Sequence, residues 1–117
     1  MKPFKQEKIY YSIKEVSEML KTPYTTLRYW ENEFDTLNPK KTDKGTRQYR
    51  KEDIEELRLI HYLVKQKKMT LAGAKQKLKE NRNSIIKTEE IVLRLENIKQ
   101  ELLLLKQEFD KLEDDNT

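Results

Sequence analysis

Residues 12–31 read SIKEVSEMLKTPYTTLRYWE and contain the signals for two short helices joined by a tight connection. Ser12 and Glu15 form a capping box, in which each side chain bonds the other residue's backbone amide at a helix N-terminus. Apolar residues follow at helical spacing, and we expect this first helix to end near Lys21.

A second helix is expected over residues 22–33. Thr22 can cap it, and Pro23 suits its first position because a missing N–H costs nothing there. Leu27 and Trp30 form its buried side. Two short helices separated by so few residues are typical of a helix-turn-helix motif.

Residues 36–50 break the helical pattern. Turn residues at 43–45 separate two short extended pieces, 40–42 and 46–49, which predicts a small hairpin. Residues 40–51 are strongly basic, with one acid, Asp43, against Lys40, Lys41, Lys44, Arg47, Arg50 and Lys51. A basic hairpin that directly follows a helix-turn-helix would be a wing, here residues 37–49.

Two further helices are expected, one from about residue 51 to 67 and one that Thr70 caps. After a break near residues 81–84 comes the strongest periodic signal of the chain, in which apolar residues alternate at spacings of four and three. This heptad seam predicts a coiled-coil helix that needs a partner. Its members are Ile91, Leu95, Ile98, Leu102, Leu105, Phe109 and Leu112.

The charged residues favour one orientation of the two coiled-coil helices only weakly. A parallel dimer would bring Arg94 against Lys99 and Glu108 against Glu113, which mildly disfavours it. Further apolar residues lie off the seam, and we expect them to pack on a winged domain, that of the partner copy in our interpretation. They are Val92, Leu93, Leu103 and Leu104.

The composition limits the function classes. The chain has 117 residues, of which 39% are charged and 35% hydrophobic, and it contains no cysteine. Residues 1–80 carry a net charge of +7 and residues 81–117 of −3, which favours a polyanionic partner for the first part. No signal peptide or membrane-spanning run is visible, so we expect a cytoplasmic protein without disulfides or thiolate metal sites.

In these features the sequence resembles the MerR family of bacterial transcription regulators. The matching blocks are YSIKEV at 11–16, TLRYWE at 26–31, PKK at 39–41, GTRQY at 45–49, and Asp53-Ile54 with Leu57. The resemblance covers roughly residues 10–80. It implies a winged helix-turn-helix domain of four helices and a β-hairpin wing, followed by a long coiled-coil helix, in a mainly α-helical chain.

The resemblance also implies partners. Family members are homodimers joined by an antiparallel coiled coil, and each winged domain binds half of a pseudo-palindromic site in double-stranded DNA. Many distort the promoter so that RNA polymerase can engage it. Since the heptads are followed only by a short tail, we expect a short form without an effector domain. Residues 1–9 would be a flexible basic terminus, 10–80 the DNA-binding domain, 81–87 a linker, 88–113 the coiled coil and 114–117 a tail.

The second helix is the natural reading element, because a single helix fits the major groove. The expected base and phosphate contacts come from Tyr24, Thr25, Thr26, Arg28 and Tyr29, although either tyrosine could instead be part of the core. In the wing, Lys40, Lys41, Lys44 and Arg47 are expected on phosphates. Arg47 could also brace the wing from inside, and Tyr49 could either reach a phosphate or pack under the wing.

No catalytic set, metal-ligand cluster or phosphate-binding glycine loop is visible, so neither an enzyme nor a cofactor is expected. His61, the one histidine, is better explained as a packed helix residue. Two alternatives to a promoter regulator remain: an excisionase-like or architectural DNA-bending protein, and a coiled-coil adaptor that binds no DNA.

Overall fold

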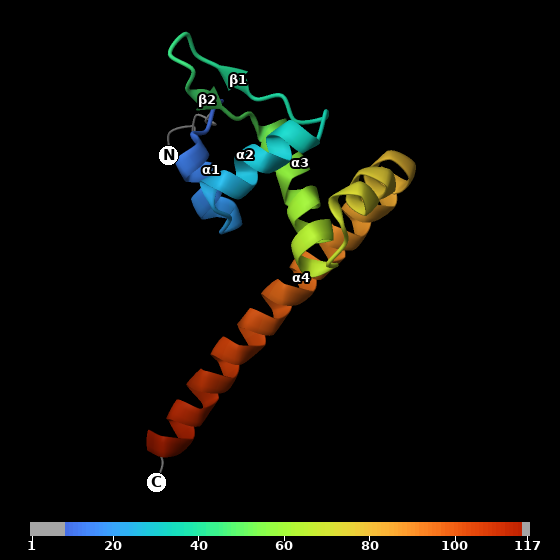
Figure 1. Ribbon diagram of the computed structural model, residues 1–117. Helices are drawn as coiled ribbons and strands as arrows, with labels where there is room; N and C mark the ends of the chain where they lie inside the picture. Colours follow the sequence, from blue (N-terminus) through green and yellow to red (C-terminus); the bar gives the residue numbers. More distant parts are fainter. Residues whose placement is uncertain (1–8, 116–117) are drawn as a thin grey trace, which may run out of the picture. The chain divides into compact units, whose positions relative to one another are not determined.

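The computed structural model describes residues 9–115, and Figure 1 shows the order of its elements. Helices α1 (Ile13–Leu20) and α2 (Tyr24–Glu33) are followed by strands β1 (Lys40–Lys41) and β2 (Arg47–Gln48). Then come α3 (Lys51–His61), the π-helix η1 (Tyr62–Gln66) and α4 (Leu71–Asp115). The expected basic N-terminal segment, with Lys2, Lys5 and Lys8, lies outside the described residues apart from Ile9.

Helix α1 begins at the capping box that the sequence predicted. The Glu15 amide donates to Ser12 Oγ at 3.1 Å, and the Ser12 amide donates to Glu15 Oε1 at 3.1 Å. The helix ends at Lys21, whose backbone is left-handed with φ 51° and ψ 46°. A left-handed residue reverses the chain sharply after a helix, which explains why α2 can begin three residues later.

The predicted cap of α2 was wrong. The N-cap residue is Pro23, in extended conformation, and the first helical residue is Tyr24. Thr22 is instead buried in the turn, where its hydroxyl donates to the Leu20 carbonyl at 2.9 Å. The Ser17 hydroxyl in turn donates to the Thr22 carbonyl at 2.5 Å. Thr22 therefore serves the end of α1, which leaves its hydroxyl unavailable to the amides of α2.

The core of the N-terminal part lies among α1, α2, α3 and the end of the hairpin. Helix α1 packs on both α2 and α3. A β-bridge adds the segment before α1, since Tyr11 and Tyr49 exchange two backbone hydrogen bonds of 2.8 Å. The sequence did not predict this bridge. The most deeply buried large side chains are Trp30, Tyr49, Leu27, Leu57, Ile60 and Val16.

The predicted third helix, residues 51–67, is two segments. The α-helical pattern stops at His61, and the next five residues form the π-helix η1, which the Lys67 amide closes by donating to the Tyr62 carbonyl at 2.9 Å. Lys68, with φ 56°, then ends the segment. A π-helix holds one residue more per turn than an α-helix, and a count of apolar residues at 3.6-residue spacing does not reveal it.

Helix α4 starts as predicted, with the Thr70 hydroxyl accepting from the Gly73 amide at 3.0 Å. Its regular geometry is interrupted at Asn81, where φ is −135° and ψ is 40°. The chain divides there into two compact units, residues 1–80 and 81–117. The expected break is therefore a single residue, and the rest of the predicted linker, 82–87, is helical because it contains neither glycine nor proline.

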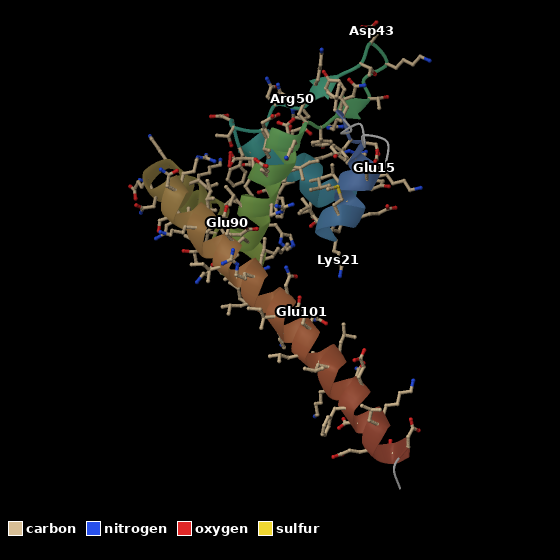
Figure 2. All side chains as sticks on the ribbon, turned by 180° about the vertical axis from the view of Figure 1, so that it is seen from behind. Glu15, Lys21, Asp43, Arg50, Glu90 and Glu101 are labelled. Atoms are coloured by element: carbon tan, nitrogen blue, oxygen red, sulfur yellow. The ribbon has the colours of Figure 1, made fainter. Side chains whose placement is uncertain are left out.

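The second unit is one helix from this interruption to Asp115, so the first two residues of the predicted tail are helical as well. Side chains project from it on all sides around Glu101 in Figure 2. All seven residues of the predicted seam are exposed. Within residues 9–115, no helix combines the length and the apolar character that a membrane span requires.

We predict that Lys21→Gly raises the free energy of unfolding by about 1 kcal/mol, because glycine adopts the left-handed backbone without a Cβ clash. Denaturant unfolding followed by circular dichroism measures the change. Lys14→Gly, which removes the same charge from the exposed side of α1, should lower the stability instead, because glycine loses more backbone freedom in a helix. Destabilisation of similar size in both variants would contradict the prediction.

Candidate nucleic-acid interface

One side of α2 is free for contact with a ligand. Four of the five residues predicted on this helix are exposed, and they lie at spacings that share one face of an α-helix. They are Tyr24, Thr25, Arg28 and Tyr29. The fifth, Thr26, is half-buried at the edge of that face. Leu27 and Trp30 point to the other side and are buried, as expected. The two tyrosines are therefore exposed residues of this face, and neither belongs to the core.

The hairpin forms as predicted, with shorter strands. Lys40 pairs with Gln48 and Lys41 with Arg47 in antiparallel register. Its turn is closed by the Gly45 amide, which donates to the Thr42 carbonyl at 2.8 Å. Gly45 has a φ of 80°, a conformation that glycine adopts without strain.

The tip of the hairpin is exposed on both sides of the turn. Figure 2 shows Asp43 at the end of the hairpin, away from the helices. Lys44, the next residue, is exposed as well. A lysine at this place can contact a nearby polyanion without disturbing the packed part of the domain.

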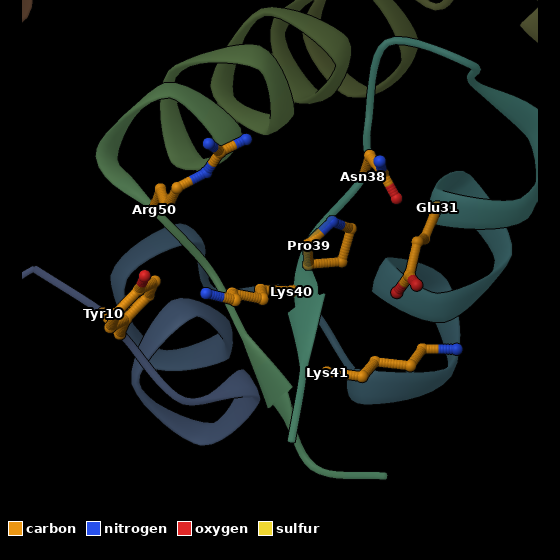
Figure 3. Close-up of a pocket in the computed structure, with 7 residues that line it drawn as sticks. All are labelled: Tyr10, Glu31, Asn38, Pro39, Lys40, Lys41 and Arg50. Carbon is orange, nitrogen blue, oxygen red and sulfur yellow. The ribbon is translucent and has the colours of Figure 1, made fainter. Parts of the chain in front are cut away.

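The register places the basic residues of the strands on two faces. Residues paired across an antiparallel ladder point to the same side, so Lys41 shares a face with Arg47, and Lys40 lies on the opposite face. Lys40 Nζ lies 5.9 Å from the ring centroid of Tyr10. Figure 3 shows the two lysines pointing to opposite sides of the strand. The predicted set of wing cations therefore does not form a single surface.

A pocket of about 620 Å³ lies at the base of the wing. Its lining residues include three with cationic side chains and one with a carboxylate, and the side chains of Lys40 and Lys41 point to opposite sides of the strand (Figure 3). The lining residues are Tyr10, Glu31, Asn38, Pro39, Lys40, Lys41 and Arg50. Lys40 and Arg50 set two cations against the carboxylate of Glu31, a positive balance that suits contact with phosphate oxygens.

The carboxylate of Glu31 in α2 accepts hydrogen bonds from two residues of the wing. Arg47 Nε donates to Glu31 Oε2 at 2.6 Å, and the Tyr49 hydroxyl donates to the same oxygen at 3.4 Å. Burial of Tyr49, and next the negative charge of Glu31, raise the pKa of Tyr49 above its ordinary value of 10.0. The phenol therefore stays protonated and acts as a donor.

The positions of Tyr49 and Arg47 are therefore not those expected of residues that contact DNA. Tyr49 is 1% exposed, so it packs under the wing and its hydroxyl does not reach the surface. The geometry of Arg47 is that of the brace that the sequence left open. Sequence reasoning missed Glu31 as the partner of both, although Glu31 stands in the TLRYWE block and Arg47 and Tyr49 in the GTRQY block.

The base of the wing is also fixed to α3. Arg50 is the N-cap residue of α3, and its amide donates to the buried carboxylate of Asp53 at 2.9 Å. The Arg50 guanidinium is 3.6 Å from the same carboxylate and 3.9 Å from that of Glu52, which is exposed. Asp53 thus connects Arg50, the residue that follows the wing, to the first turn of α3.

His61 is a packed residue, in agreement with the interpretation of the sequence. Its ring lies edge-on to that of Trp30, with centroids 6.3 Å apart and planes at 77°. Burial, and next the charge of Lys65, lower the pKa of His61 below its ordinary value of 6.5, so the imidazole is neutral at pH 7. Among residues 9–115, no group of three His, Cys, Asp or Glu side chains is arranged to hold a metal ion.

A face of exposed side chains on the second of two closely joined helices, beside a basic hairpin, defines a winged helix-turn-helix protein. The family model described as "MerR HTH family regulatory protein" matches residues 11–81, more than half of the chain. The protein belongs to the MerR family of helix-turn-helix regulators.

A solved structure supports the same fold. The crystal structure of HiNmlR, described as a MerR family regulator lacking the sensor domain and bound to promoter DNA, matches with a TM-score of 0.53. The two sequences are 21% identical, and the match covers 86% of this chain and 88% of the other. No curated protein sequence matches the chain.

We predict that Asp53→Ala lowers the free energy of unfolding by about 1–2 kcal/mol, because it removes the acceptor of the Arg50 amide at the start of α3. Thermal or denaturant unfolding measures the loss. Glu52→Ala is the matched control: it also removes an acid from the first turn of α3, but from an exposed position where an ion pair contributes little. Equal losses in the two variants would show that Asp53 has no special role.

Proposed function

We propose that this protein is a dimeric, sequence-specific DNA-binding transcription regulator that acts at bacterial promoters. The observation that carries the proposal is the exposed face of α2 beside the basic wing, in a chain of the MerR family. The fold match to HiNmlR, which is described as bound to promoter DNA, supports it. Such a protein works in the bacterial cytoplasm, on the nucleoid.

In this proposal the exposed face of α2 enters the major groove. Arg28 lies in the middle of that face, and its planar guanidinium can bind guanine O6 and N7 together. Tyr24, Thr25 and Tyr29 surround it and offer hydroxyl groups and ring faces to bases and phosphates. Thr26, half-buried, contributes at the margin of the contact.

The wing supplies contacts to the sugar–phosphate backbone. Two lysines of the wing are exposed, Lys44 at the tip and Lys41 on the α2 side of the hairpin. Their charged groups are not used in the hydrogen bonds that hold the domain together. Lys40, on the opposite face, contacts phosphates through the pocket that it shares with Arg50. Each neutralised phosphate releases counterions, so binding weakens steeply as salt rises.

We predict that Arg28→Ala loses specific DNA affinity while the protein stays folded. A bidentate contact to a base contributes about 1–3 kcal/mol of discrimination, so each half-site should lose roughly tenfold or more. The test selects bound fragments from bacterial genomic DNA and then measures the affinity of each variant for a recovered fragment.

Arg58→Ala is the matched control, because it removes the same exposed charge from α3 and should bind normally. Normal binding by Arg28→Ala would show that α2 is misassigned as the reading helix. The footprint on the recovered fragment should be two-fold symmetric and lie in a promoter spacer. A footprint at a recombination attachment site would favour the excisionase-like alternative, and no salt-sensitive binding at all would favour an adaptor.

The second unit of the chain provides the dimer contact in this proposal. The seven apolar seam residues are all exposed in the single chain, and a helix with such a seam is stabilised by a second copy. We place the two copies antiparallel, as the family resemblance implies, and this arrangement avoids the like-charge neighbours that a parallel pair would create. Two reading helices related by two-fold symmetry then match a pseudo-palindromic site. RNA polymerase, bound to the same promoter, is the expected further partner.

We predict that Leu103→Ala with Leu104→Ala weakens the dimer. Both leucines are exposed and lie off the seam, where we place them against a winged domain of the partner copy. A leucine that becomes buried contributes roughly 1.5–3 kcal/mol, so sedimentation should show dissociation at a higher protein concentration. The control, Gln100→Ala with Gln107→Ala, alters the side of the helix away from the seam. Unchanged dimerisation in the leucine variant would exclude this packing.

A further inference from the structure

Arg47 stands apart from the other basic residues of the wing because its charge is already paired. Its Nε atom is 2.6 Å from Glu31 Oε2, and the side chains of the two residues are only 21% and 10% exposed. Lys41 and Lys44, by contrast, are exposed. Position in a basic hairpin therefore does not by itself make a cation available to DNA.

The environment of Glu31 makes this pairing hard to exchange. Its carboxylate accepts from Arg47 and from the buried hydroxyl of Tyr49 at the same oxygen. If Arg47 turned outward to a phosphate, the nearly buried carboxylate would keep only the longer, 3.4 Å bond from the neutral phenol. Leaving a buried charge without its partner costs more than an exposed ionic contact returns.

We propose that Glu31 is a positioning residue for DNA binding: it holds Arg47 and Tyr49 so that the wing and α2 bind as one rigid unit, and Arg47 is a brace that touches no phosphate. The inference rests on the proposed function and narrows its set of DNA contacts. Glu31 follows Arg28 by three residues on the same helix, so the residue that anchors the wing and the residue that reads a base move together.

The backbone of the wing supports the same coupling. Tyr49 is bonded through its amide and carbonyl to Tyr11, which precedes the N-cap residue of α1, and through its hydroxyl to Glu31 of α2. The next residue, Arg50, is the N-cap residue of α3. Loss of the Glu31 carboxylate would therefore free β2 on the side of α2 while its attachments to α1 and α3 remain.

The experiment separates a brace from a phosphate contact by salt dependence. Affinity for a fragment recovered by the genomic selection is measured over a range of salt concentrations for the wild type, Arg47→Gln, Glu31→Gln and Lys44→Gln. A lost phosphate contact reduces the slope of log K against log salt by about 0.9, hence by about 1.8 for both protomers of a dimer. We expect that reduction in Lys44→Gln alone.

Arg47→Gln and Glu31→Gln should each lower the affinity about tenfold at every salt concentration and leave the slope unchanged. The double variant Glu31→Gln/Arg47→Gln should lose no more than the worse single variant, because both changes break one interaction. A slope reduced in Arg47→Gln as in Lys44→Gln, or losses that multiply in the double variant, would overturn the proposal.

A measurement made without DNA distinguishes a failure of the positioning role of Glu31 from a failure of the proposed DNA-binding function. Amide hydrogen exchange at residues 40–48 should become faster in Glu31→Gln than in the wild type, and Lys44→Gln should leave it unchanged. Protected wing amides in Glu31→Gln refute the positioning role even if DNA binding holds. Absence of salt-sensitive DNA binding by the wild type refutes the proposed function, and with it the DNA part of this inference. If Arg47→Gln does not fold, the slope of log K against log salt in the absence of Arg47 is measured on the double variant Glu31→Gln/Arg47→Gln, in which neither charge of the pair remains.

Discussion

The carboxylate of Glu31 is the constraint on which the position of the wing against α2 depends. A two-residue ladder between β1 and β2 is too short to fix a hairpin by itself, because an isolated hairpin is at best marginally stable. The charge-assisted bond to Arg47 and the bond to Tyr49 add what the ladder lacks. Both bonds are made by a residue of α2, so the wing takes its position from that helix.

Around this contact the polar residues of the domain fall into two groups, those that hold the fold together and those that remain exposed. Asp53, Thr22, Arg47 and Tyr49 are buried or partly buried and hold turns and caps together. Arg28, Lys41 and Lys44 remain exposed and carry no such duty in the hydrogen bonds of the domain. The number of Lys and Arg residues in 1–80 thus overstates the number of cations offered to a polyanion, because some of them are paired with acids inside the domain.

Much of the fold was predictable because its signals are local. The capping box of Ser12, the Thr70 cap and the turn at Gly45 depend on residues a few positions apart, and all three form. Apart from the cap of α2 and the π-helix, what escaped prediction is non-local. The bridge between Tyr11 and Tyr49 and the bond between Glu31 and Arg47 join residues far apart in the chain, and no spacing rule connects them. Exposure on α2 followed from helical periodicity, whereas burial of Tyr49 required the packed domain.

The π-helix η1 changes the rotational phase of the chain between α3 and α4. A single extra residue in a helical turn rotates every following side chain by about 100° around the helix axis. Tyr62 and Leu63 in this segment are buried, as are Leu59 and Ile60 at the end of α3. The segment is equivalent to an α-helix with a single inserted residue. Its register, and with it the direction in which the chain leaves toward Lys68, is therefore sensitive to the loss or gain of one residue here.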